Sequence, residues 1–134
     1  MEYPQPAYEM ACEDETSETL SLVYGPSTEP LWVTTLGILI ETQARHHGQR
    51  IAVVFPQDGV TRTYQQLFDR STIIAKALLE AGLERGDRVG IFAGNCYQYI
   101  EVFLGASRIG CPVTVLNTNY TPTELQNAVS TSGM

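Results

Sequence analysis

The 134-residue sequence contains a single lysine, Lys76. A phosphate loop of the Walker kind needs a lysine directly after its glycines, and neither that pattern nor GxGxxG occurs here. The sequence also lacks a pair of histidines or cysteines at zinc-ligand spacing, and no serine stands in a recognised nucleophile motif. We therefore predict no catalytic, cofactor-binding or metal-ligating residue from these patterns.

Cysteine is scarce: only Cys12, Cys96 and Cys111 occur. Their odd number and unpaired spacing indicate reduced thiols in an intracellular protein. Cys96 and Cys111 flank a predicted helix, and buried packing explains them better than metal binding. His46 and His47 stand at a predicted helix end without an acid–cysteine set nearby, which favours a solvated helix terminus over a metal site.

The segment Ser130-Thr131-Ser132-Gly133 resembles the start of a phosphate loop rich in serine, threonine and glycine. Such a loop follows a strand, so that its amides point at the ligand. Here the segment ends a predicted helix, and Gly133 fits a C-terminal stop. We therefore interpret it as a helix end.

Long apolar runs are also absent. No run approaches the ~18 residues of a membrane span, so we expect no span. The net charge of −7 is concentrated near the N-terminus, because residues 1–30 carry seven acidic and no basic side chains, while residues 31–134 carry eight of each. A neutral body argues against nucleic acid as a partner, because phosphate binding needs a basic face.

The N-terminal composition predicts a flexible acidic tail over residues 1–19. An acidic, arginine-free start is the opposite of a mitochondrial presequence, and no secretory signal pattern is visible. The expected location is intracellular, with the cytoplasm as the default.

What the sequence does contain is an apolar run at Val89–Ala93, a stretch of helical length, and a second apolar run at Pro112–Leu116. This order predicts a βαβ unit with two parallel strands. Asn95 is the predicted N-cap of the helix between them, and Gly110 its end. The predicted fold class is α/β.

Further elements precede and follow this unit. Ile51–Phe55 and Val60–Tyr64 flank an Asp-Gly turn, which predicts a hairpin. The predicted helices are one from Leu36 to about His47, one that Thr63 caps and Gly82 ends, and one that begins after Thr121.

Four segments, in this order and spacing, resemble motifs of one family: Thr63–Leu67, Gly82–Val89, Asn95–Cys111 and Asn117–Leu125. The chain is similar over about residues 20–134 to the N-terminal part of the AMP-forming acyl-activating ligases. The segment Leu20–Pro26 narrows the resemblance to the medium-chain branch called acyl-CoA synthetase family member 2. Residues 20–134 are accordingly predicted to be an incomplete N-terminal subdomain of that fold.

The resemblance implies the reaction of a carboxylic acid with ATP and coenzyme A, through an acyl-adenylate, with ATP, Mg²⁺ and coenzyme A as cofactors. The family's phosphate loop, ribose-binding aspartate and catalytic lysine would all follow residue 134, so none is carried over to a residue here. One hypothesis is therefore an N-terminal fragment of an acyl-CoA synthetase, inactive alone, whose partner is the missing remainder of the ligase. The alternative is a standalone interaction or regulatory module that pairs with a full-length relative.

Overall fold

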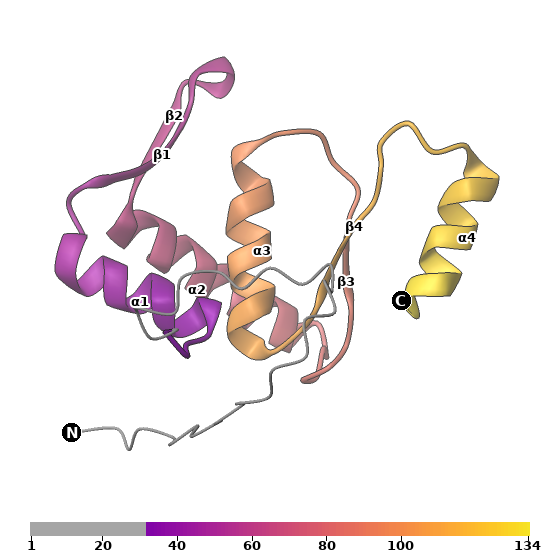
Figure 1. Cartoon of the computed structure of the whole chain (residues 1–134), viewed down its shortest axis with the longest axis horizontal. Coiled ribbons are helices and arrows are strands. Elements are labelled where there is room, and N and C mark those ends of the chain that lie inside the picture. Colours follow the sequence, from indigo (N-terminus) through magenta and orange to yellow (C-terminus); the bar gives the residue numbers. More distant parts are fainter. Residues whose placement is uncertain (1–31) are drawn as a thin grey trace, which may run out of the picture. The chain divides into compact units, whose positions relative to one another are not determined.

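The computed structural model describes residues 32–134, of which Val33–Met134 form one compact unit (Figure 1). The predicted tail over residues 1–19 and the Leu20–Pro26 motif lie outside the described residues. The helices are α1 (Leu36–His47), η1 (Pro56–Asp58), α2 (Tyr64–Glu80), α3 (Tyr97–Ile109) and α4 (Pro122–Ser132). The strands are β1 (Ile51–Phe55), β2 (Val60–Thr63), β3 (Val89–Ile91) and β4 (Val113–Val115).

The predicted hairpin is confirmed, because β1 and β2 pair antiparallel around the short helix η1. Gly59 closes the turn in the left-handed conformation at φ 62°, which glycine adopts without strain. Thr63 then starts α2 with a capping box: its hydroxyl accepts a hydrogen bond from the Gln66 amide, and the Gln66 side chain accepts one from the Thr63 amide. The second strand therefore passes directly into a helix.

The predicted βαβ unit is also confirmed. Strands β3 and β4 pair parallel, with Val89 opposite Val113 and Ile91 opposite Val115, and α3 connects them. Both strands are shorter than the apolar runs that predicted them. Among the described residues β3 pairs only with β4, so the hydrogen bonds between these two strands end together.

The predicted cap of α3 is wrong. Cys96, one residue after Asn95, occupies the N-cap position, and no side chain bonds the free amides there. The helix instead begins with a main-chain bond in which the Tyr99 amide donates to the Cys96 carbonyl at 3.2 Å. Its other end is as predicted, because Gly110 has a left-handed φ of 78°.

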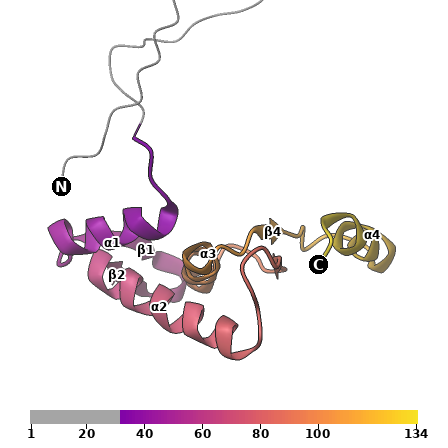
Figure 2. The same cartoon turned by 90° about the horizontal axis from the view of Figure 1, so that it is seen from below.

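The core lies where α1, α2 and α3 meet, and Figure 2 shows these three helices side by side. Ile40, Leu67 and Leu104 supply one buried side chain from each helix. Burying an aliphatic side chain of this size stabilises a fold by about 1.5–3 kcal/mol. Within residues 32–134 no helix is long and apolar enough to cross a membrane.

Helix α4 begins with a second capping box, in which both the amide and the hydroxyl of Thr121 donate to the Glu124 carboxylate at 2.8 Å. The hydrogen bond from the Thr121 amide, helped by the one from its hydroxyl, holds the pKa of Glu124 below its ordinary value of 4.5. A carboxyl with a depressed pKa stabilises the folded state above its unfolded pKa, and that contribution is lost as the pH falls through its folded pKa.

We therefore predict that α4 frays as the pH falls below the ordinary value of 4.5, and that Glu124→Gln removes this pH dependence. The Cα chemical shifts of α4 across an acid titration would measure it. Glu80→Gln, at the exposed end of α2, is the control and should leave the α4 profile unchanged. An identical titration of α4 in wild type and Glu124→Gln would refute the prediction.

Candidate functional site

The one charged side chain that is fully buried among the described residues is Glu101, on α3, with 1% of its surface exposed. Each of its carboxylate oxygens has its own arginine. The Arg62 Nε donates to Oε1 and the Arg70 Nε donates to Oε2, both at 3.1 Å. We call Glu101, Arg62 and Arg70 the carboxylate clasp.

The clasp joins α3 to two consecutive elements that precede it in the chain, β2 and α2. Arg62 is on β2, immediately before the capping box that starts α2, and Arg70 is near the middle of α2. The Arg62 guanidinium also lies 5.3 Å from the centre of the Tyr97 ring, on the first turn of α3. A cation over an aromatic face is stabilised by the ring quadrupole. The hairpin is therefore fastened to α3 by one side chain that makes two contacts.

In the sequence, Arg62 and Arg70 stand singly and eight positions apart. The fold brings Arg62 and Arg70 to one carboxylate, although no loop clusters them. Reasoning from the sequence missed the site, yet a signal was available. Glu101 stands four residues after Tyr97 and four before Gly105, on the stripe of α3 that also carries the buried Leu104.

The charges of the clasp limit its chemistry. A shallow pocket of about 200 Å³ lies beside it, lined by Arg62, Gln66, Asp69 and Arg70. Glu101 and Asp69 balance the two arginines, so this pocket offers no net positive charge to a phosphate. Each Glu101 oxygen accepts a hydrogen bond from an arginine, and the side chain is only 1% exposed, so the carboxylate is not open to a substrate in this arrangement. The geometry is that of a structural ion cluster.

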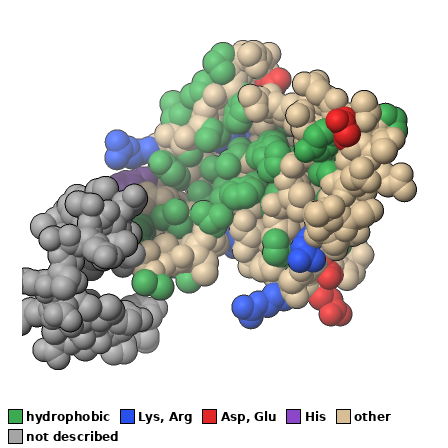
Figure 3. Space-filling view, turned by 45° about the vertical axis from the view of Figure 1, so that its right-hand side comes forward, with side chains coloured by type: hydrophobic (Ala, Val, Ile, Leu, Met, Phe, Trp, Pro, Cys, Tyr) green, Lys and Arg blue, Asp and Glu red, His purple; other side chains and the backbone are tan. Residues whose placement is uncertain are grey.

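A second cavity, of about 430 Å³, is apolar and lies between α1, the start of α2 and α3. Its lining consists of Leu36, Leu39, Ile40, Gln43, Tyr64 and Leu104. Exposed apolar side chains continue over the surface, and Figure 3 shows hydrophobic side chains gathered on one face of the described part of the chain. No titratable group except the Tyr64 hydroxyl lines this cavity, so its lining contributes no acid–base pair.

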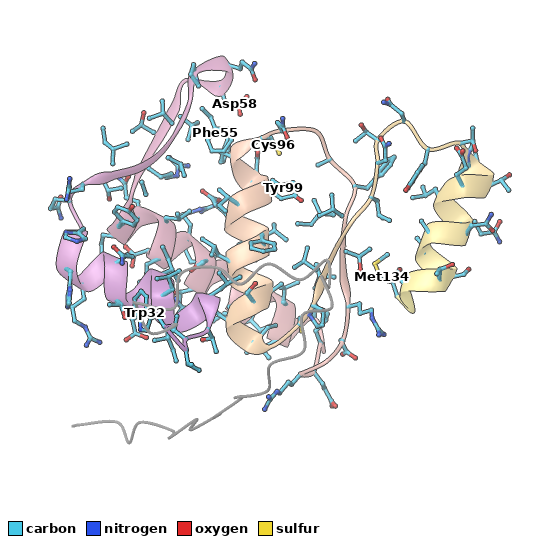
Figure 4. The ribbon with its side chains drawn as sticks, viewed as in Figure 1. Trp32, Phe55, Asp58, Cys96, Tyr99 and Met134 are labelled. Atoms are coloured by element: carbon cyan, nitrogen blue, oxygen red, sulfur yellow. The ribbon has the colours of Figure 1, made fainter. Side chains whose placement is uncertain are left out.

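The structure separates the other residues that the sequence singled out. Cys111 is buried and its thiol donates to the Glu84 carbonyl at 3.2 Å, while the half-buried Cys96 lies at the start of α3 (Figure 4). His46 and His47 are exposed in the last turn of α1, as predicted. Within residues 32–134, no three His, Cys, Asp or Glu side chains gather as a metal site.

The remaining two features that the sequence singled out are Lys76 and the segment Ser130–Gly133, and both belong to helices or helix ends. Lys76 is exposed on α2, away from both pockets. Ser130–Ser132 are helical, and Gly133 ends α4 in the left-handed conformation with its amide bonded to the helix. This is the predicted helix end.

A fold of hairpin, long helix and parallel βαβ unit defines the class of protein, and sequence comparison agrees with it. A model of the family of AMP-binding enzymes matches residues 40–134. The chain therefore belongs to this family, the AMP-forming ligases, and the resemblance predicted from the sequence is confirmed.

The relatives are acyl-CoA ligases. The acyl-CoA ligase cnsG of Penicillium expansum is 44% identical over 113 residues, which are 84% of this chain and 24% of the relative. The mitochondrial medium-chain acyl-CoA ligase ACSF2 of Danio rerio is 31% identical over 111 residues, 83% of this chain and 18% of the relative. The chain thus spans a quarter or less of the length of these relatives.

A solved structure shows the same fold. The fatty acyl CoA synthetase of Mycobacterium tuberculosis superposes with a TM-score of 0.71 at 27% identity, covering 74% of this chain and 20% of that one. The predicted α/β class, with the hairpin and βαβ unit of the N-terminal part of these ligases, is confirmed.

Proposed function

We propose that this chain forms the N-terminal part of an AMP-forming acyl-CoA ligase, which converts a carboxylic acid, ATP and coenzyme A into acyl-CoA, AMP and pyrophosphate. The observation that carries the proposal is the family match over residues 40–134, together with relatives that are acyl-CoA ligases. The order of hairpin, α2 and βαβ unit in this chain supports it.

Within such a ligase we assign these residues a supporting role. The cofactors of the reaction would be ATP, Mg²⁺ and coenzyme A, and the described residues do not fit them. The two arginines that lie together are balanced by Glu101 and Asp69. The only lysine, Lys76, is exposed on α2 and lines neither pocket. We therefore propose that nucleotide and coenzyme A bind to other parts of the ligase, which this part of the fold holds in place.

The 134-residue chain, purified alone, is expected to show no fatty-acid-dependent exchange between ATP and pyrophosphate. Adenylation builds charge on the reacting phosphate, and preorganised donors or cations for that charge are commonly the largest catalytic contribution. Each ~1.4 kcal/mol of missing stabilisation lowers the rate tenfold. Exchange that co-purifies with the wild-type chain, and disappears when Arg62 and Arg70 of this chain are replaced by methionine, would contradict the expectation.

A graft tests the proposal directly. Residues 33–134 would replace the aligned segment of the Penicillium expansum acyl-CoA ligase, and exchange with its own acid substrate would be compared with the parent. If this segment supports the ligase as the parent's own segment does, the chimera retains the parent's activity within about tenfold, a difference of ~1.4 kcal/mol. A chimera with a normal cooperative thermal transition but no exchange would refute the proposal.

The same graft carrying Gly94→Ala serves as its control, because nothing lies within 4 Å of the added methyl group. This control should behave as the unmodified chimera does. A loss in both chimeras with intact folding counts against the proposal, whereas a loss confined to the control would show that the Gly94 loop itself takes part.

A second function, a module that pairs with a full-length ligase, has one observation in its favour. Phe92, which follows β3, and Val115, the last residue of β4, are exposed. Among the described residues these two strands have no further strand neighbours. Exposed strand edges are templates for pairing with another chain. The two proposals can be separated by mixing the chain with a full-length relative and measuring both light scattering and ligase activity. A defined complex that changes the ligase activity supports the module. Independent species support the ligase segment.

A further inference from the structure

We draw no further inference here: the strongest candidate, the apolar cavity between α1, the start of α2 and α3, is lined by Leu36, Leu39, Ile40, Gln43, Tyr64 and Leu104, but nothing in the described structure shows what covers it.

Discussion

Replacing Glu101 by alanine is expected to lower the free energy of unfolding by about 3 kcal/mol. The change removes the only carboxylate that Arg62 and Arg70 share and leaves two guanidinium groups without their acceptor. Breaking a fully buried ion pair costs about 3–5 kcal/mol. We place the effect at the lower end because the Arg62 and Arg70 side chains are 25% and 45% exposed, so water solvates them in part.

Urea unfolding followed by circular dichroism measures this difference. The matched control is Glu41→Ala, which removes the carboxylate of the exposed pair between Glu41 and Arg45 on α1, where the two groups lie 3.0 Å apart. An exposed pair one helical turn apart contributes only about 0.3–0.5 kcal/mol. The interpretation fails if the Glu101 change costs no more than the Glu41 change.

Two further variants distinguish ion pairing from simple loss of volume. Glu101→Leu alone restores the volume but leaves Arg62 and Arg70 without an acceptor, whereas a triple variant also removes their charges. Glu101→Leu combined with Arg62→Met and Arg70→Met replaces all three charges by apolar side chains of similar size. Replacing a whole buried ion cluster in this way is commonly neutral or stabilising, whereas removing one member is not. We expect the triple variant to recover most of the stability that Glu101→Ala loses. If Glu101→Leu alone is as stable as the triple variant, the volume of Glu101 matters and its charge does not.

The elements that were predicted correctly share one property: their signals are local. The capping boxes at Thr63 and Thr121 each involve a partner three residues away, and the Asp-Gly turn sits between the two strands that it joins. Gly110 ends α3 because it takes the left-handed conformation, which glycine adopts without strain. Such short-range chemistry can be read from the sequence before any tertiary contact is known.

The carboxylate clasp has the opposite character. Its hydrogen bonds join residues 39 and 31 positions apart, and only the packing of α2 on α3 brings them together. Charged residues are rarely fully buried, so an acid within an apolar helix is expected at the surface unless its partners are known. The prediction that Asn95 caps α3 is also wrong. Asparagine is a favoured residue type at this position, but α3 begins one residue later, with Cys96 as its N-cap.

The second large effect is expected at Gly105, on the face of α3 that packs against α2. A Cβ atom added at Gly105 would lie 2.6 Å from Ile74 Cγ2, 2.8 Å from Ile74 Cβ and 3.1 Å from the Ser71 carbonyl oxygen. These are atoms at or near the backbone of α2, so they cannot swing away as the tip of a flexible side chain would. The two helices approach this closely because position 105 has no side chain.

Gly105→Ala is therefore expected to lower the free energy of unfolding by about 2 kcal/mol, since overpacking a core costs about 1–3 kcal/mol. The sign of this change in the free energy of unfolding is informative. Alanine is a better helix former than glycine by about 1 kcal/mol, so the same substitution would stabilise an unconstrained helix. Thermal or urea unfolding of the purified chain measures the change. The control is Gly94→Ala, where the added methyl group meets nothing within 4 Å.

An Ile74→Ala background separates the clash from any other effect of the new methyl group. Truncating Ile74 removes the nearest atom, Cγ2, and leaves the Cβ at 2.8 Å, so the relief is partial. The two changes in one chain should thus cost less than the sum of their separate costs, because residues in contact couple while distant ones add. Additive costs, or a Gly105→Ala variant as stable as wild type, would mean that α2 and α3 have room between them and that this glycine does not set their separation.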